Sequence, residues 1–275
     1  QAFLKGNPIE AVIHFAGLKS VSQSVKFPLE YWGNNLIGSI NLLKVMNNNN
    51  CRNLIFSSSA SIYGRNKKGL LNEKDKINPI NPYSNTKFAI EILLNDLLES
   101  YPNSWKILNL RYFNPIGAHD SGMIGEEPKG MPNNIFPIIL EVASKNISSL
   151  KIFGKDWPTK DGTGVRDYVH IMDIATGHAS ALEYLFSSEY EIVNLNLGTG
   201  KGTSVLDLIK SFEKENQVKI PYEFIDKREG DLPIVIADNK LVLDTLNWKP
   251  SRSIEQMCRD GWNWKKNLEL NHNNF

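Results

Sequence analysis

Short apolar runs alternate with helical stripes of apolar residues along the first part of the chain. The run A-V-I-H-F-A-G at residues 11–17 ends in glycine, and N-L-I-F-S-S-S at residues 53–59 ends in hydroxyl groups; both are typical of buried parallel strands. Residues 107–112 repeat this pattern as a third strand. Residues 28–46 and 84–101 carry apolar side chains at helical spacing. Strand, helix, strand, helix, strand in this order predicts a doubly wound parallel sheet.

The pattern changes after residue 115. Glycine, proline, aspartate and asparagine become frequent at residues 117–134 and 154–164, which is typical of loops that form a binding surface. Further regular elements are predicted beyond the first of these loops, namely a helix at 172–186, a strand at 192–197 and helices near 204–215 and 253–267. We therefore expect a Rossmann-like α/β domain of residues 1–114, which residues 168–197 rejoin, and a smaller α/β domain of residues 115–275.

The glycine-rich turn that opens a dinucleotide-binding sheet is missing from this sequence. No G-x-G-x-x-G follows a predicted strand, although backbone N–H groups of that turn normally cradle the phosphates. The chain begins with Gln1 and enters a polar stretch at once. We therefore expect a fragment whose sheet is N-terminally truncated and lacks its first strands.

Composition excludes several classes of function. The chain has 275 residues, with 31 Lys and Arg against 30 Asp and Glu, so no net field favours nucleic acid or an acidic membrane surface. No apolar run approaches the roughly 18 residues of a membrane span, and no signal pattern opens the chain. Cys51 and Cys258 lie far apart, which argues against a disulfide framework and fits a reducing compartment. We expect a cytoplasmic protein.

Two histidines lie in apolar runs, but neither indicates a metal site. His14 and His170 have no second ligand at metal spacing, and a hydrogen-bonded core histidine is the more common role in such a position. We therefore predict that no metal is bound.

A Tyr-x-x-x-Lys pair stands at the start of the second predicted helix. Tyr83 follows Pro82 and precedes Lys87 by four residues, a spacing that places both side chains on one helix face. A phenol has a pKa near 10, and a neighbouring ammonium group lowers it by favouring the phenolate. Such a pair can exchange a proton with a substrate hydroxyl while hydride leaves the same carbon. Exposed helices also carry Tyr and Lys at this spacing without any function, so the pair alone leaves both interpretations open.

Two further motifs end at the same predicted edge of the sheet. Ser57 to Ala60 close the second strand, where ligands of open α/β sheets bind, although hydroxyl groups there can equally be solvated loop residues. Together with the Tyr-Lys pair, Ser59 becomes a candidate bridge between a substrate hydroxyl and the phenol. Tyr112, Phe113 and Asn114 end the third strand. The three motifs predict one shared crevice.

A longer series of motifs runs in order from residue 11 to about residue 265. They are F-A-G-L-K (15–19), N-N (34–35), S-S-S-A-S-I-Y-G (57–64), N-P-Y-S-N-T-K (81–87), L-R-Y-F-N-P-I-G-A-H (110–119), P-N-N (132–134), D-G-T-G-V-R-D-Y-V-H (161–170) and R-E-G-D-L-P (228–233). In content and spacing this series resembles the UDP-glucose 4-epimerase family, which belongs to the extended short-chain dehydrogenases/reductases. The resemblance lacks the family's glycine-rich front segment.

The resemblance implies an NAD-dependent isomerase. Tyr83 would be the acid/base, Lys87 would lower its pKa and hold the nicotinamide ribose, and Ser59 would bridge the sugar 4-hydroxyl. NAD would be tightly held in the first domain and end each cycle unchanged, after the 4-keto sugar has turned over in the site. The remaining NAD contacts implied are Phe15, Ala16, Gly17, Leu18, Lys19, Asn34 and Phe113.

The resemblance also implies a UDP-sugar substrate, UDP-glucose or UDP-galactose, in the second domain. Its nucleotide and sugar contacts would be Asn114, Asn134, Ile135, Lys151, Ile152 and Phe153, and its diphosphate and ribose contacts Arg166, Arg228, Glu229, Gly230 and Asp231. Arginine suits this role because its planar fork matches phosphate oxygens. A bulky Tyr borders the sugar C2 substituent in the family, and Val235 stands at the aligned position, so N-acetylated UDP-sugars are expected to be accepted as well.

Members of the family are typically homodimers, with two helices of the sheet domain packing against their mates. Residues 28–46 and 84–101 could do this, although burial within one monomer explains the same apolar stripes.

Two other functions compete with epimerisation. A nucleotide-sugar 4,6-dehydratase shares the fold, NAD and the Tyr-Lys pair, but that family carries Asp-Glu where this chain has Ala60 and Ser61. Neither of these residues supplies the extra acid and base that elimination requires, so the dehydratase is disfavoured. A non-catalytic nucleotide-sugar-binding remnant is the second alternative, because the front of the NAD site is missing.

Overall fold

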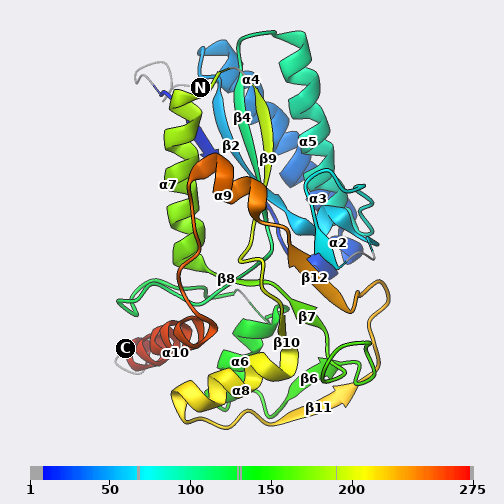
Figure 1. Ribbon diagram of the computed structural model, residues 1–275, viewed down its shortest axis with the longest axis vertical. Coiled ribbons are helices and arrows are strands. Elements are labelled where there is room, and N and C mark those ends of the chain that lie inside the picture. The colour runs from blue at the N-terminus through cyan, green and yellow to red at the C-terminus, as the bar shows by residue number, and fades with distance from the viewer. Residues whose placement is uncertain (1–8, 67–68, 129, 131, 190, 273–275) are drawn as a thin grey trace.

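A four-stranded parallel sheet forms the upper part of the molecule (Figure 1). The computed structural model describes residues 9–66, 69–128, 130, 132–189 and 191–272. The sheet has the order β1-β2-β4-β9, and its strands are Val12–His14, Asn53–Ser59, Lys106–Tyr112 and Ile192–Leu197. Every neighbouring pair is parallel. The predicted parallel sheet is therefore confirmed, with β2 and β9 at their expected bounds.

Helices cover both faces of this sheet, with α7 (Ile171–Ser187) on one side and α4 (Gly38–Asn48) and α5 (Pro82–Ser100) on the other (Figure 1). Alternate strand residues point to opposite faces. Ile55 therefore packs in the cluster that contains residues of α7, while Phe56 packs in the cluster that contains residues of α4 and α5. Because both faces are buried, the strands read as nearly continuous apolar runs.

Helix α5 starts two residues earlier than the sequence pattern indicates. Asn81 is its N-cap, and its side chain accepts a hydrogen bond from the Ser84 N–H. The Ser84 hydroxyl in turn accepts a bond from the Asn81 N–H, which completes a capping box. Pro82 occupies the first helical position, where its missing N–H is not needed. Tyr83 consequently lies inside the first turn rather than before it.

The first predicted helix contains a π-helical segment. The helix runs through α3 (Pro28–Tyr31), the π-helix η1 (Trp32–Ile37) and α4, and a separate short helix, α2 (Val21–Lys26), precedes it. Each extra residue in a π-turn rotates the side chains that follow relative to an α-helix. The change falls at Asn34 and Asn35, so only the structure decides which asparagine faces inward.

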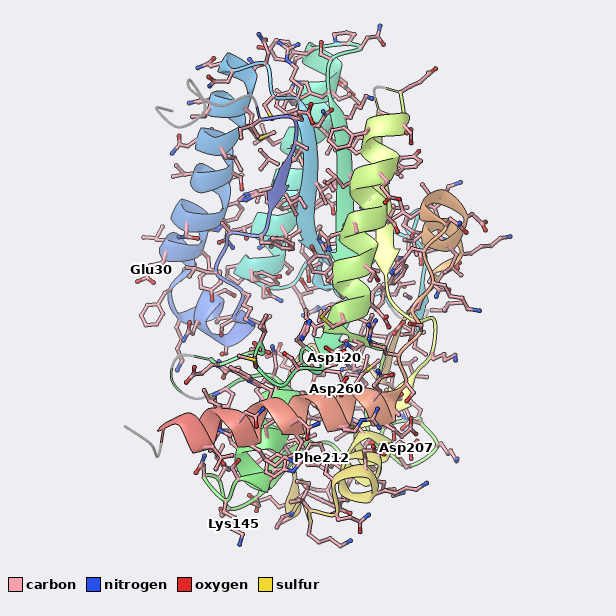
Figure 2. All side chains as sticks on the ribbon, turned by 90° about the vertical axis from the view of Figure 1, so that its left-hand side faces the viewer. Glu30, Asp120, Lys145, Asp207, Phe212 and Asp260 are labelled. Carbon is pink, nitrogen blue, oxygen red and sulfur yellow. The ribbon has the colours of Figure 1, made fainter. Side chains whose placement is uncertain are left out.

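The lower part of the molecule has its own core (Figure 1). Its elements are α6 (Ile135–Ala143), β6 (Leu150–Phe153), α8 (Val205–Asn216), β11 (Tyr222–Ile225) and α10 (Ile254–His272). Figure 2 shows α10 lying across this region with Phe212 beneath it, and the Phe212 ring meets Trp262 of α10 edge-on at 6.0 Å between centroids. Among the described residues, no helix combines the length and apolar character that a membrane crossing requires.

Short strands connect the two parts. The strands are β3 (Leu70–Leu71), β5 (Asn114–Ile116), β7 (Val165–Arg166), β8 (Tyr168–His170), β10 (Thr203–Ser204) and β12 (Ile234–Ala237). The 3₁₀ turn η2 (Ala60–Tyr63) and the helix α9 (Lys240–Leu246) accompany them. Asp167, between β7 and β8, is fully buried and accepts hydrogen bonds from the N–H groups of Thr199, Gly200 and Ala237. This carboxylate ties β12 and the loop after β9 to the strand that carries Arg166.

Candidate active site

Helix α5 meets the carboxyl end of β2 through the Tyr-Lys pair. The Lys87 ammonium donates a hydrogen bond of 2.6 Å to the Ser57 carbonyl, and it lies 6.0 Å from the centroid of the Tyr83 ring. The Tyr83 phenol interacts with the Ser59 hydroxyl, which also accepts a bond from the Ser61 N–H. Tyr83, Lys87 and Ser59 are thus brought together at the strand end, as the spacing and the strand position predicted.

Burial changes the pKa of both members of the pair. It lowers the pKa of Lys87 to about 8, because the side chain is only 4% exposed and the ammonium is poorly solvated. Burial also raises the pKa of Tyr83, and the neighbouring Ser59 hydroxyl opposes this only in part. Desolvation of the phenol therefore dominates the pKa of Tyr83 in the protein alone, and the lowering of that pKa by Lys87, whose ammonium is directed at the Ser57 carbonyl, stays a prediction.

The buried Lys87 predicts a pH dependence of stability. Its pKa is about 8 in the folded state against 10.5 in the unfolded chain, so the folded state carries the full cost of the buried ammonium below pH 8. That cost declines as the pH rises toward 10.5. We expect the unfolding free energy of the wild type, relative to Lys87→Met, to increase by roughly 2–3 kcal/mol between pH 7 and pH 10 in urea titrations.

An exposed lysine provides the control for this measurement. Lys44 of α4 is exposed, so Lys44→Met should leave a difference from the wild type that is independent of pH. A constant difference for Lys87→Met as well would contradict the depressed pKa of Lys87.

The loop after β1 is fastened beside this pair by Asn35. The Asn35 amide accepts from the Leu18 N–H at 2.7 Å and donates to the Leu18 carbonyl at 3.0 Å and to the Thr86 hydroxyl at 3.1 Å. A Cβ atom on Gly17 would lie 3.2 Å from the Asn35 oxygen and 3.8 Å from the Lys87 nitrogen. Glycine therefore leaves bare backbone next to the lysine, which allows a ligand to approach closely.

Asn34, the residue named from the family resemblance, lies on the exposed side of the π-helical segment, whereas Asn35 is 2% exposed. The contact of Asn34 with a cofactor stays a prediction. The family resemblance assigns a role to Asn34 and none to Asn35, and helical spacing alone does not reveal the π-turn.

The other residues expected to line the cofactor lie along the same sheet edge. Phe15 is 57% exposed and contacts the His178 ring at 4.8 Å between centroids, and Ala16 is also exposed. Lys19 forms an ion pair with Glu126 of the loop after β5. Phe113, by contrast, is buried in a cluster with residues of η2. These residues border one region, but their individual contacts with a cofactor stay predictions.

A tyrosine and a histidine that were given no role in the sequence analysis adjoin the pair. The Nδ1 of His178 lies 2.8 Å from the Ile174 carbonyl and must donate to it, so its Nε2 accepts the bond of 2.7 Å from the Tyr112 hydroxyl. Burial raises the pKa of Tyr112, and the Ser57 side chain opposes this rise. No local pattern distinguishes His178 from other helix residues, so the sequence offered no signal for this contact.

The predicted substrate residues fall into two groups. Arg166 of β7 pairs in register with Val235 of β12, and its guanidinium donates to the Leu232 carbonyl at 2.9 Å. The Asn114 N–H donates to the carbonyl of Asp167, the residue that follows Arg166, at 3.0 Å. This first group therefore lies between the sheet and the lower core.

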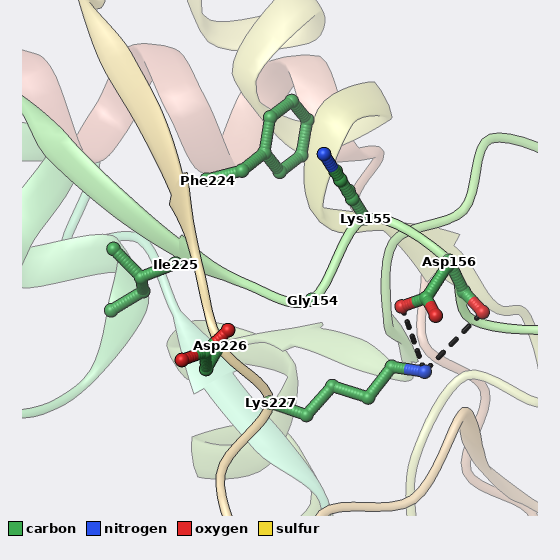
Figure 3. Close-up of a pocket in the computed structure, with 7 residues that line it drawn as sticks. All are labelled: Gly154, Lys155, Asp156, Phe224, Ile225, Asp226 and Lys227. Carbon is green, nitrogen blue, oxygen red and sulfur yellow. Dashed lines mark hydrogen bonds and ion pairs between the residues drawn. The ribbon is translucent and has the colours of Figure 1, made fainter.

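The second group surrounds Phe153 at the end of β6. The Arg228 guanidinium lies over the Phe153 ring at 3.5 Å from its centroid. Beside them is a hollow of about 400 Å³ in which Lys227 and Asp156 form an ion pair of 2.8 Å (Figure 3). Ile152 is buried in the lower core, so only its backbone can reach a ligand. The other predicted members differ in exposure: Asn134, Lys151 and Glu229 are exposed, and Ile135, Gly230 and Asp231 are half-buried.

The two histidines of the apolar runs have protein partners. The Nε2 of His14 bonds to the Ser39 hydroxyl at 2.8 Å, and the Nε2 of His170 bonds to Asp260 at 3.2 Å. His170 also accepts from the Met172 N–H. Within the described part of the chain, no group of three or more His, Cys, Asp or Glu residues is arranged to hold a metal ion.

The chain as a whole is similar to known sugar-nucleotide enzymes. A family profile described as GDP-mannose 4,6 dehydratase matches residues 1–261. The chain is 48% identical to UDP-glucose 4-epimerase 2 of Arabidopsis thaliana, over 96% of this chain and 75% of that protein. It is 46% identical to the UDP-glucose 4-epimerase of Bacillus subtilis, over 94% of this chain and 76% of that protein.

Solved structures agree with this placement. The UDP-glucose-4-epimerase of Stenotrophomonas maltophila, crystallised with bound NAD and formylated UDP-arabinopyranose, has a TM-score of 0.95 and 43% identity, covering 98% of this chain and 80% of that one. The UDP-glucose 4-epimerase of Bifidobacterium longum, in complex with NAD⁺ and UDP, has a TM-score of 0.91 and 41% identity, covering 99% and 80%. The Rossmann-like fold expected from the sequence is thereby confirmed.

Proposed function

The chain belongs to the UDP-glucose 4-epimerase family, and we propose that it interconverts UDP-glucose and UDP-galactose by inverting C4 with the help of tightly bound NAD. The observation that carries this proposal is the meeting of Tyr83, Ser59 and Lys87 at the carboxyl end of β2, directly beside Gly17. The acid/base Tyr83 and the accessible backbone of Gly17 therefore border the same place, where the reacting carbon of the sugar would lie.

The residues present fit a nicotinamide cofactor. The bare backbone of Gly17 lies next to the Lys87 ammonium, and the exposed Phe15 and Ala16 continue this edge. NAD would be held by the segment 15–19, Asn34, Lys87 and Phe113, and when bound it supplies a reversible hydride acceptor. Its positive nicotinamide ring would also favour the tyrosinate, which the protein alone disfavours.

The chain's own residues handle the proton and the sugar nucleotide. Ser59 orients the 4-hydroxyl toward Tyr83, and the phenolate takes the proton from that oxygen and later returns it, so Tyr83 ends unchanged. Arg166 and Arg228 hold the diphosphate. The sugar itself must be held loosely, because each face of its C4 atom has to be presented to the cofactor in turn. The further UDP-sugar contacts proposed are Asn114, Asn134, Ile135, Lys151, Ile152, Phe153, Glu229, Gly230 and Asp231.

Experiment can separate epimerisation from its two alternatives, a dehydratase and a non-catalytic remnant. Although the matching profile is described as a dehydratase, Ala60 and Ser61 begin η2 and offer no carboxyl group for elimination. A purified sample should convert UDP-galactose to UDP-glucose and the reverse, and should release about one NAD per chain on denaturation. A 4-keto-6-deoxy product would favour the dehydratase, and absent turnover with no released NAD would favour a non-catalytic remnant.

The size of residue 235 predicts the substrate range. Val235 is half-buried and packs against the cluster that contains Phe113. We expect turnover of N-acetylated UDP-sugars, and we expect Val235→Tyr to lower kcat/KM for them about 10–200-fold while changing UDP-glucose turnover little. Val235→Ala, which removes bulk, serves as the control and should accept both classes. Failure of the wild type to turn over UDP-N-acetylglucosamine would contradict this prediction.

We propose the two-domain division with one addition. Residues 1–114 and 168–197 would form the NAD domain and the remainder of 115–275 the nucleotide-sugar domain, except that Val242, Leu246 and Trp248 pack in the cluster formed with α7 and the sheet. Residues 240–248 are therefore assigned to the first domain. Limited proteolysis should release fragments that follow this division.

We also propose a cytoplasmic homodimer. Ile37 is 55% exposed on the first long helix and Ile92 is 46% exposed on α5, so both helices retain apolar surface for a second copy. Cys51 and Cys258 are buried free thiols, which suits a reducing compartment. Light scattering should give a molar mass twice that of one chain, and a monomer would contradict the proposal.

A further inference from the structure

A row of polar residues crosses the sheet beneath the reacting edge. Ser58 of β2 pairs in register with Arg111 of β4, which in turn pairs with Asn196 of β9. All three are nearly fully buried, and each lies one residue before the end of its strand. Buried arginine is rare unless its charge is paired, so this row requires a partner.

The partner is Glu91 of α5, which is 3% exposed. Its carboxylate accepts two hydrogen bonds from Arg111, at 3.0 Å from Nε and 2.7 Å from Nη2, in the bidentate geometry that suits arginine and carboxylate. The same carboxylate accepts a bond of 2.6 Å from the Ser58 hydroxyl. Glu91 thus joins the helix to two strands at once.

Arg111 and two of its neighbours make further hydrogen bonds around this ion pair. Arg111 donates from Nη1 to the Tyr63 hydroxyl at 2.9 Å and to the Glu73 carbonyl at 3.0 Å. Tyr63 donates to Asn196 at 2.8 Å, and Asn196 donates to the Leu71 carbonyl at 2.9 Å. A buried network with these bonds made is rigid, because moving one member leaves another without its partner.

This rigidity bears on the reacting groups through helix geometry. Glu91 lies four residues after Lys87 and eight after Tyr83, so all three share one face of α5. On β2, Ser58 lies between Ser57, which binds Lys87, and Ser59, which contacts Tyr83. The place where Glu91 meets Ser58 therefore sets how α5 is aligned with the end of β2.

The Arg111 charge has a second consequence. A lone carboxylate one turn from Lys87 would stabilise the ammonium and hold it toward Glu91. Because the bidentate contact with Arg111 neutralises Glu91, the ammonium remains directed at the Ser57 carbonyl.

We propose that Glu91 is a positioning residue for the reaction: through Ser58 it aligns Tyr83 and Lys87 with Ser59, without touching substrate or cofactor. This proposal rests on the proposed epimerase function. Misplacement by about 1 Å of a group that must meet the substrate can reduce a rate about 100-fold, so a loosened alignment is expected to affect kcat.

Ser58→Ala tests the proposal because it removes the link to β2 and keeps the Glu91–Arg111 ion pair. We expect kcat for UDP-galactose to fall about 10-fold while KM changes less than about 3-fold, since the nucleotide anchors are untouched. Asn194→Ala is the matched control. It removes the 2.8 Å bond between Asn109 and Asn194, on the same face of the sheet but farther from its reacting edge, and should reduce stability without reducing kcat.

A second measurement does not depend on turnover. The phenol of Tyr83 can be titrated by ultraviolet absorbance, as the difference between the wild type and Tyr83→Phe. The groups that face the Tyr83 phenol are those of Tyr31, Ser59, Tyr112 and Lys87, and His14 in turn lies near Lys87. We expect Ser58→Ala to raise this pKa by about half a unit or more, because the contact with Ser59 is weakened, and Asn194→Ala to leave it unchanged.

Each outcome decides the question. A reduced kcat together with a raised Tyr83 pKa in Ser58→Ala, with neither change in Asn194→Ala, supports the positioning role of Glu91. Loss of stability in Ser58→Ala with an unchanged titration and unchanged kcat would overturn it and leave the network a purely structural one. Absence of turnover in the wild type would defeat the proposed function instead, and the titration would still decide whether Glu91 positions Tyr83.

Discussion

Replacing Tyr83 with Phe is expected to lower kcat for UDP-galactose about 1,000-fold, within the range of about 10²–10⁴ that general acid-base catalysis contributes. The change removes one hydroxyl and keeps the ring that packs at the start of α5. Loss of the hydroxyl leaves Ser59 and Lys87 in place, but no remaining group can take a proton from the 4-oxygen of the sugar. Steady-state assays in both directions measure the effect, and KM should change little because the diphosphate contacts are intact.

A second tyrosine of the same helix region provides the control. Tyr101 caps the C-terminus of α5, is 40% exposed and lies beneath the Arg52 guanidinium. Tyr101→Phe should therefore retain wild-type kcat. If Tyr83→Phe keeps more than about a tenth of the wild-type rate, another group must move the proton and the assignment of Tyr83 is wrong.

The largest effect on stability is expected from Arg111→Met. The substitution leaves the Glu91 carboxylate buried without its cation and removes the donors to Tyr63 and to the Glu73 carbonyl. Breaking a buried ion pair at one partner costs about 3–5 kcal/mol, so the unfolding free energy should fall by that amount in urea titrations. Because a domain is stabilised by only about 5–15 kcal/mol, the variant should unfold at a clearly lower denaturant concentration.

Two further variants separate the ion pair from the loss of a side chain. Arg259 is 50% exposed and pairs with Glu215 at 2.7 Å, so Arg259→Met should cost no more than about 1 kcal/mol. The double variant Arg111→Met with Glu91→Met removes both charges and should recover much of the stability lost in the single variant. Equal losses for Arg111→Met and Arg259→Met would show that burial of the pair has no consequence for stability.

The sequence pattern predicted the parallel sheet because both of its faces are buried. Strands β2 and β9 appear at their expected bounds, since a run such as L-I-F is apolar whichever face each side chain occupies. Helix α5 was predicted two residues too short, because its start is decided by the capping box of Asn81 and Ser84 rather than by apolar spacing. Helix α6 and strands β6 and β11 were not predicted, because they span only nine, four and four residues, which is too short for a clear apolar period.

The candidate site divides in the same way. Tyr83 and Lys87 share a face because residues four apart in any α-helix do so, and Ser59 lies with them because strand ends of a parallel sheet meet at one edge. The raised pKa of Tyr83 was not foreseen, because spacing shows the nearby cation but not the burial of the phenol. Asn35 was given no role, because a π-turn and not the α-helical period brings it to Leu18.

The sequence by itself determined the alternation of strands and helices in the sheet domain, the face on which Tyr83 and Lys87 stand, and the family to which the motifs point. These properties follow from hydrogen bonds between residues a few positions apart and from the order of short motifs. Only the tertiary structure decided that Lys87 binds the Ser57 carbonyl, that Asn35 holds the loop at Leu18, and that Glu91 pairs with Arg111. Burial and charge pairing depend on which distant segments come into contact, and no local period specifies that contact.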